Sequence, residues 1–324
     1  MNRSEPDAPA GDLLQQMLGG IECPGDLVAF GQALNQSWGN IMRKRREVAA
    51  AALPFESEAV DWYRLGRRPV DASAKPSRSL RYAAGDYFVQ DAGSLLALAA
   101  LEADSDALEG KLVCDLCAAP GGKASAVAEA FHASSLDGGS GFLLANEVIR
   151  SRRGALQLNL ARTGSDRYAI STMDPDQLAD RLPGVFDVVL VDAPCSGQAM
   201  IARGKQKKSS LTMNQIEHSA ARQNRILDSA LRLLRDGGQL CYSTCTFAEA
   251  ENESQVTRLI ENGRVSASPR DQLSHYQSAR GCYRLWPHLH HCAGSFAASM
   301  VAHQTEESKP RTRKREPRAK SPAD

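Results

Sequence analysis

From about residue 90 onward, short apolar runs alternate with longer amphipathic stretches along this 324-residue chain. The short runs predict strands, and apolar residues recurring every three or four positions predict helices. The expected strands cover 111–116, 142–147, 168–171, 186–194 and 239–245. The expected helices cover 90–103, 121–131, 149–162, 213–236 and 249–262. Such alternation predicts an α/β protein whose mostly parallel, doubly wound sheet is covered by helices on both faces.

In a sheet of this kind, ligands bind outside the carboxyl ends of the strands. Four segments with small or reactive residues follow expected strands: CAAPGG (117–122), Glu147, DAPCSG (192–197) and Cys245. Because these strand ends lie at one edge of the sheet, the sequence predicts a single cleft that contains all four.

The segment DLCAAPGGKAS (115–125) is a strand-to-helix turn rich in small residues. A phosphate-binding P-loop would need a glycine five residues before the Gly-Lys pair and Ser or Thr after it. Cys117 and Ala124 occupy those places, and the dinucleotide pattern GxGxxG is absent. The turn therefore favours a nucleoside-type cofactor without phosphates, as in enzymes that use S-adenosylmethionine (SAM).

Three further side chains fit this interpretation. Glu147, at the end of the second strand, can accept hydrogen bonds from both ribose hydroxyls. Asp174, after the third strand, is placed to accept one from the adenine amino group, and Lys123 to contact the cofactor carboxylate or ribose. Either acid alone would more simply be a solvated loop residue, but their register behind the Gly-rich turn favours cofactor binding.

At the other end of the cleft, the sequence places Asp192 and Cys195 after one strand and Cys245 after the next. A thiolate that adds to C6 of cytosine makes C5 nucleophilic toward a methyl donor. A base must then remove the C5 proton before the thiol can leave. Two thiols and a carboxyl group suit this chemistry, although the residues alone do not rank the thiols. A buried core cysteine is the simpler alternative for Cys245.

These motifs, in this order, resemble the Sun/RsmB-type RNA (cytosine-5) methyltransferases. The resemblance runs from about Arg81 to residue 301 and rests on four segments: DLCAAPGGKAS, ANEVIRSR, DAPCSG and YSTCTFAEAENE. It implies a Rossmann-like class I SAM-dependent core that acts on ribosomal or transfer RNA. It further implies that Cys245 is the nucleophile and that Cys195 assists product release. The implied cofactor contacts are Cys117, Ala118, Ala119, Pro120, Gly121, Gly122, Lys123, Glu147, Asp174 and Asp192.

The sequence departs from the family pattern in three places. Ala124 replaces the usual Thr, Glu147 replaces the usual Asp, and the helical RNA-binding domain that usually precedes the core is not recognisable. The expected organisation is a flexible start (1–12), a small N-terminal region with linker (13–79), a methyltransferase domain (80–303) and a basic disordered tail (304–324).

The net charge says nothing about a partner, since 39 Lys and Arg nearly balance 38 Asp and Glu. The distribution of the basic residues along the chain is more informative. Basic clusters at 43–46, 203–208 and 309–320 could neutralise RNA phosphates, although each could equally be a solvated face. No apolar run is long enough for a membrane span and no signal peptide begins the chain, so a cytoplasmic protein with reduced thiols is expected.

A four-thiolate zinc site built from Cys114, Cys117, Cys241 and Cys245 is disfavoured, because these residues lie on strands rather than on tight hairpins. We therefore expect no metal. The predicted function is SAM-dependent methylation of cytosine C5 in RNA through a covalent Cys245–C6 adduct. The alternatives are a DNA cytosine-5 methyltransferase and a catalytically silent RNA-binding ribosome-assembly factor of the same fold.

Overall fold

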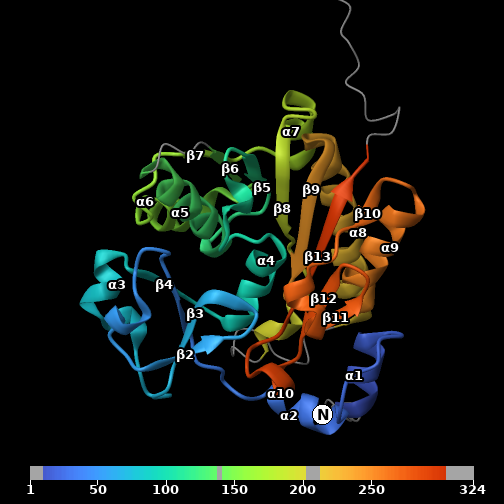
Figure 1. Ribbon diagram of the computed structural model, residues 1–324. Helices are drawn as coiled ribbons and strands as arrows, with labels where there is room; N and C mark the ends of the chain where they lie inside the picture. The colour runs from blue at the N-terminus through green and yellow to red at the C-terminus, as the bar shows by residue number, and fades with distance from the viewer. Residues whose placement is uncertain (1–9, 137–140, 202–211, 304–324) are drawn as a thin grey trace, which may run out of the picture.

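The computed structural model describes residues 10–136, 141–201 and 212–303 (Figure 1). The basic cluster at 203–208 and the tail at 309–320 lie outside the described residues. Within the described residues, no helix combines the length and apolar character needed to cross a membrane. The first helix begins at Ala10, inside the segment that the sequence predicts to be flexible.

The N-terminal region contains a four-stranded antiparallel sheet in the order β2-β3-β1-β4. Its elements are α1 (Ala10–Leu18), α2 (Leu27–Ala33), β1 (Ile41–Lys44), β2 (Ser57–Val60), β3 (Tyr63–Pro69), α3 (Leu80–Ala84) and β4 (Tyr87–Gln90). The sequence did not predict this sheet, and its fourth strand comes after residue 79, within the segment assigned to the larger domain. Trp62 ties it to the rest of the protein, since the indole Nε1 donates to the Ala92 carbonyl at 3.1 Å.

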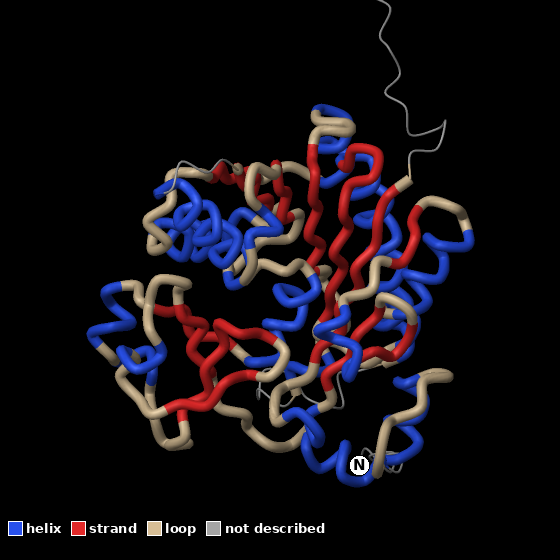
Figure 2. Tube along the Cα trace, in the orientation of Figure 1, coloured by secondary structure: helices blue, strands red, loops and turns tan. Residues whose placement is uncertain are grey.

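A nine-stranded sheet forms the larger part of the described chain (Figures 1 and 2). The strands β9-β8-β5-β6-β7 are parallel, and β13 runs antiparallel beside β9. The parallel strands are β5 (Leu112–Asp115), β6 (Phe142–Asn146), β7 (Tyr168–Ser171), β8 (Phe186–Asp192) and β9 (Leu234–Thr244). The antiparallel strands are β10 (Val265–Ala267), β11 (Gln277–Ala279), β12 (Cys282–Leu285) and β13 (Ser295–Ala302). All five predicted strands are confirmed.

Helices cover both faces of this sheet. They are α4 (Leu95–Ala100), α5 (Gly122–Leu136), α6 (Arg153–Ala161), α7 (Pro175–Arg181), α8 (Met213–Leu233) and α9 (Glu253–Glu261), while the short helix α10 (Pro287–His290) packs against α2. Successive residues of β8 point to opposite faces, as a strand requires. Val188 and Leu190 join the core under α4, α5 and α6, whereas Val189 and Val191 join the core under α7, α8 and α9. The predicted α/β fold with a doubly wound sheet is confirmed.

Two predicted helix boundaries differ from the structure because strand pairing extends further than expected. The helix predicted from residue 90 starts later, since Gln90 pairs with Ile41 in β4 and Asp91 then caps a short 3-10 turn by accepting from Gly93 N at 2.8 Å. The helix predicted to reach residue 236 ends at Leu233, since the buried Leu234 already pairs with Phe186 of β8.

The side chains of the basic cluster at 43–46 make contacts within the protein. Arg43 is 1% exposed, pairs with Glu129 of α5, and donates to Ser125 Oγ at 2.8 Å. The other three side chains also have partners: Lys44 with the Val48 carbonyl, Arg45 with the Arg162 carbonyl and Arg46 with Asp106. Arg43 therefore fastens the N-terminal sheet to α5, the helix that follows the Gly-rich turn.

Arg43→Ala is expected to lower the free energy of unfolding by about 3 kcal/mol, because it leaves the Glu129 carboxylate largely buried without its partner. Urea denaturation followed by circular dichroism measures the loss. The double variant Arg43→Ala/Glu129→Ala is expected to be more stable than the single variant, since no uncompensated charge remains. A loss below about 1 kcal/mol in the single variant would contradict this role.

Candidate active site

The candidate site lies at the carboxyl ends of β5, β6, β8 and β9, as the sequence predicts. Asp192 is the last residue of β8, and Cys195 follows three residues later. Thr244 is the last residue of β9, so Cys245 is the first residue beyond it. Adjacent parallel strands thus deliver both thiols to the same edge of the sheet. Gly197, with φ of 72°, then turns the chain away in a left-handed conformation that suits glycine.

The two predicted catalytic thiols are in direct contact. Cys195 Sγ and Cys245 Sγ lie 3.3 Å apart, and both residues are half-buried. The hydrogen bond from Cys195 lowers the pKa of the Cys245 thiol, an effect that burial opposes and the Lys123 charge assists. The same hydrogen bond, together with burial, raises the pKa of the Cys195 thiol. The arrangement therefore favours a thiolate at Cys245 and a protonated thiol at Cys195.

An ion pair lies beside the thiols. Lys123 Nζ is 2.7 Å from Asp192 Oδ2, and Ser243 Oγ donates to Asp192 Oδ1 at 2.8 Å. Burial lowers the pKa of Lys123, but the charge of Asp192 and its hydrogen bond outweigh this effect and raise the pKa overall. Lys123 therefore keeps its positive charge in a largely buried place, where it lowers the pKa of Cys245, while the charge of Asp192 has a larger effect in the opposite direction.

The Gly-rich turn, Cys117 to Lys123, is held from several sides. Ala118 N donates to the Asn146 carbonyl at 2.8 Å, and Asn159 Nδ2 donates to the Pro120 carbonyl at 2.8 Å. Gly121 has φ of 112°, and a Cβ there would lie 3.1 Å from Asn159 Cβ, so only glycine fits. The turn leads directly into α5, which begins at Gly122.

The two acids predicted to contact the cofactor differ in their surroundings. Glu147 is 3% exposed; its Oε1 accepts from Ile149 N at 2.9 Å, and Oε2 lies 3.1 Å from Arg152 Nη1. Asp174 caps α7 by accepting from Asp176 N at 3.0 Å and also accepts from Arg225 Nη2 at 2.6 Å. The carboxylate of Asp174 thus already has strong partners, and its contact with adenine stays a prediction.

Asp115, the last residue of β5, is not among the site residues predicted from the sequence. Asp115 is buried; its Oδ1 accepts from Cys117 N at 3.3 Å, while Oδ2 has no hydrogen-bond partner among the described residues. Burial, followed by the charge of Asp192, raises the pKa of this carboxyl group to about 7. Its position, directly before the Gly-rich turn at a strand end, was the signal available in the sequence.

Comparison with known proteins shows the family to which this chain belongs. The sequence profile of the family described as 16S rRNA methyltransferase RsmB/F matches residues 104–301, which include every predicted site residue. The chain belongs to the RsmB/F family. A ribosomal RNA small subunit methyltransferase F from Aeromonas salmonicida is 29% identical over 261 residues, which are 78% of this chain and 54% of that protein. The enzyme of the same name from Erwinia tasmaniensis is 34% identical over 237 residues, 71% of this chain and 48% of that protein.

The chain thus spans about half the length of the curated RsmB/F relatives that it matches. Two solved structures from Pyrococcus horikoshii share its fold. A methyltransferase homolog has a TM-score of 0.74 and 24% identity, covering 90% of this chain and 93% of its own. NSun6, solved with SFG, has a TM-score of 0.69 and 17% identity, covering 91% and 98%. The predicted class I methyltransferase fold is confirmed.

S-adenosylmethionine is the cofactor of this family, and the residues present fit it. Asp115 Oδ2 is a buried acceptor atom that lacks a hydrogen-bond donor among the described residues, and Glu147 Oε2 is a buried acceptor that pairs with the exposed Arg152 guanidinium at 3.1 Å. Such atoms suit a ligand that brings an ammonium group and two ribose hydroxyls. The fit supports Glu147 as a ribose contact and adds Asp115 as a candidate partner for positive charge.

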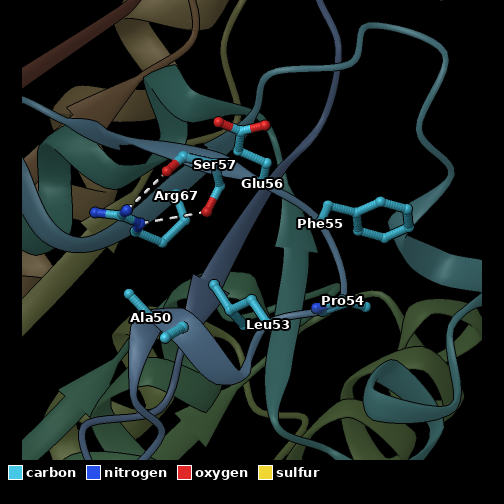
Figure 3. A pocket seen from close by; sticks show the side chains of 8 residues that line it. Ala50, Leu53, Pro54, Phe55, Glu56, Ser57 and Arg67 are labelled. Atoms are coloured by element: carbon cyan, nitrogen blue, oxygen red, sulfur yellow. Dashed lines mark hydrogen bonds between the residues drawn. The ribbon is translucent and has the colours of Figure 1, made fainter.

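No group of three or more His, Cys, Asp or Glu side chains in the described ranges could hold a metal ion. Cys114 and Cys241 lie in the cores on opposite faces of the sheet, which excludes the four-thiolate site considered above. A separate cavity of about 310 Å³ lies in the N-terminal region, lined by Leu53, Phe55, Arg67 and neighbours (Figure 3). No predicted site residue lines it.

The Asp115 carboxyl group makes the stability of the free protein depend on pH. Its pKa is higher in the folded protein than in the unfolded chain, so the folded state binds more protons between about pH 4 and pH 7. The free energy of unfolding is therefore expected to fall as pH rises through this window and to level above it. Asp115→Asn should remove this slope and raise stability at pH 8 by at most about 4 kcal/mol.

Urea denaturation of the free protein at several pH values measures this effect. Asp166→Asn, at an exposed carboxyl group, is the matched control and is expected to leave the slope unchanged. Two results would contradict the raised pKa of Asp115. One is a wild-type stability that does not decline between pH 4 and pH 7, and the other is an equal decline in Asp115→Asn.

Proposed function

We propose that this protein transfers a methyl group from S-adenosylmethionine to C5 of a cytosine in RNA, through a covalent bond between Cys245 Sγ and C6. The observation that carries the proposal is the 3.3 Å contact between Cys195 and Cys245 beside the Asp192–Lys123 ion pair. A core cysteine needs neither a second thiol nor a buried charge pair, whereas this chemistry uses a nucleophilic thiol, a second group that moves a proton and a carboxyl group.

In this mechanism, bound S-adenosylmethionine supplies an electrophilic methyl group. The Cys245 thiolate adds to C6, and the electron pair of the C5–C6 bond makes C5 nucleophilic. Asp192, held by Lys123 and Ser243, would accept a hydrogen bond from the exocyclic amine of the base and so hold the adduct in place.

Release of the product requires loss of the C5 proton, which returns its electron pair to the C5–C6 bond and expels the Cys245 thiolate. Cys195 assists this step. Once Cys245 Sγ is bonded to carbon, the hydrogen bond between the thiols is lost, and with it the largest contribution that raises the pKa of Cys195. Cys195 then releases its own proton to solvent more readily than in the free protein, and the thiolate so formed can accept the C5 proton.

The family description and the names of the curated relatives favour 16S ribosomal RNA as the substrate. That substrate fits the cytoplasmic location predicted from the sequence. The target cytosine has to leave its stack to reach two half-buried thiols. Contacts with the RNA backbone would come from basic side chains other than Arg43, Arg45 and Arg46, because the charged groups of these three bind partners within the protein.

Trapping with 5-fluorocytosine tests the proposal, because fluorine at C5 cannot leave as a proton and the adduct persists. The protein is incubated with S-adenosylmethionine and either RNA or DNA carrying this base. A denaturation-resistant RNA complex linked through Cys245 is expected. A complex formed only with DNA would instead support a DNA cytosine-5 methyltransferase.

The silent assembly factor is tested separately by isothermal calorimetry with S-adenosylmethionine. Measurable binding is expected, since Asp115 Oδ2 is a buried acceptor without a hydrogen-bond partner among the described residues. Absence of binding would contradict the enzymatic function and would favour the catalytically silent RNA-binding assembly factor.

A further inference from the structure

Glu251 is a buried carboxylate that the reaction outlined above does not use. It lies in the short turn before α9 and is fully buried, at 0% exposure. Its Oε2 accepts from the backbone N of Ser196 and from Gln223 Nε2, each at 2.9 Å, and its Oε1 accepts from Thr246 Oγ1 at 3.4 Å. Burial raises the pKa of Glu251, so its place in the core has an energetic cost that these donors offset.

Two of the partners of Glu251 directly follow the two cysteines in the sequence. Ser196 comes after Cys195, and Thr246 comes after Cys245. A single carboxylate therefore joins the loop beyond β8 to the loop beyond β9. A second contact reinforces the link, since Ser196 Oγ and Thr246 Oγ1 lie 2.9 Å apart.

Gln223, a buried residue of α8, extends the same network. Its Nε2 donates to the Pro194 carbonyl at 3.1 Å as well as to Glu251. The backbone on both sides of Cys195 is thus held, by Gln223 before it and by Glu251 after it. Because the whole network is buried, loss of the carboxylate would leave several donors without an acceptor.

We propose that Glu251 is a positioning residue for methyl transfer, which holds the Cys195 and Cys245 loops so that the two sulfurs stay within hydrogen-bond distance. This role rests on the proposed function, because it concerns the same thiol pair. Glu251 contacts neither sulfur, and it acts through the backbone and hydroxyl groups that flank them.

The role of Glu251 can be measured through the ionisation of the Cys245 thiol. Cys195, Asp192, Lys123 and Glu251 all influence its ionisation, and the contact with Cys195 is the largest influence. That contact depends on loop geometry, whereas the Glu251 charge acts through space and raises the pKa of both thiols. Loss of positioning and loss of charge therefore change the Cys245 pKa in opposite directions.

Two variants separate these effects. Glu251→Gln keeps an oxygen that can accept from Ser196 and Gln223 and gains an amide that can donate to Thr246, so the loops stay joined. Its Cys245 is expected to react at lower pH than in the wild type, because a negative charge has gone. In Glu251→Ala the loops separate, the hydrogen bond between the thiols is lost, and Cys245 is expected to react at higher pH.

The measurement is alkylation of the reduced full-length protein by iodoacetamide between pH 6 and pH 10, in the absence of RNA, with the modification of Cys245 and Cys195 quantified by mass spectrometry. Wild type and Glu251→Gln are expected to favour Cys245 over Cys195. In Glu251→Ala this preference should fall about tenfold, which corresponds to a shift of one pKa unit. With RNA, Glu251→Ala should lower kcat and leave KM for RNA nearly unchanged.

Glu253→Gln is the matched control, since Glu253 is a neighbouring buried carboxylate that pairs with Arg284 and not with the thiol loops. It should leave the preference for Cys245 intact. Thr246→Val removes only the hydroxyl link and should lower the preference to a smaller extent, which provides a test should Glu251→Ala fail to fold.

The outcomes distinguish this proposal from the proposed function. A wild-type protein that shows no preference for Cys245 would count against the thiol assignment itself. A wild-type preference that persists unchanged, with the same pH midpoint, in Glu251→Ala and Thr246→Val would overturn the role of Glu251 alone.

Discussion

Replacement of Cys245 with alanine is expected to abolish formation of 5-methylcytosine, with a loss of turnover on the order of 10⁴-fold or more. Without this sulfur nothing adds to C6, and C5 is too weak a nucleophile to take the methyl group. Mass spectrometry of nucleosides from RNA incubated with the protein and S-adenosylmethionine measures the product. No covalent RNA complex should form with this variant.

Cys23→Ala, which removes a half-buried thiol outside the pair, is the control and should retain activity. Binding of S-adenosylmethionine to Cys245→Ala should also persist, because Asp115, Glu147 and the Gly-rich turn are unchanged. Production of 5-methylcytosine at the normal rate by Cys245→Ala would disprove the assignment of the nucleophile.

Replacement of Cys195 with alanine is expected to have a different result, since addition to C6 can proceed but release cannot. Turnover should fall on the order of 10²- to 10⁴-fold, the usual contribution of a group that moves a proton. A covalent complex between RNA and Cys245 should accumulate and survive denaturation, so that gel electrophoresis followed by mass spectrometry locates the linkage.

The same variant is expected to change the pH dependence of complex formation. The hydrogen bond from Cys195 is the main cause of the lowered Cys245 pKa, so its loss raises that pKa. Complex formation in Cys195→Ala should therefore require a higher pH than the first turnover of the wild type. If Cys195→Ala turns over without accumulating a complex, Cys195 has no part in release.

Part of the larger sheet could be predicted from its apolar runs, because a parallel strand covered by helices on both faces is apolar along most of its length. The run 186–192 is the best example and forms β8. The N-terminal sheet could not be predicted in this way. Its strands are short, and β1 carries the charged sequence RK at 43–44, which is stable there because Arg43 pairs with Glu129 on a helix 86 residues later.

Within the site, the two thiols also combine a feature that the sequence predicts with one that depends on contacts between distant residues. The positions of Cys195 and Cys245 after two strands indicate that they share one edge of the sheet. Which thiol ionises depends on the 3.3 Å contact and on the charge of Lys123, and neither follows from strand order. Asp115 was overlooked for a related reason, since its raised pKa results from burial and from Asp192, which lies 77 residues away in the chain.

Hydrophobic periodicity and small-residue turns are local properties, so the amino-acid sequence alone predicts the five parallel strands with the helices between them, the class of fold and the edge of the sheet where the motifs meet. Which side chains touch depends on packing between segments that are distant in the chain. This packing brought Lys123 to Asp192, Cys195 to Cys245, and Glu251 between the loops that carry the two thiols. Hydrogen bonds and charge interactions act over a few ångströms, so these contacts and their pKa effects exist only after packing has brought distant segments together.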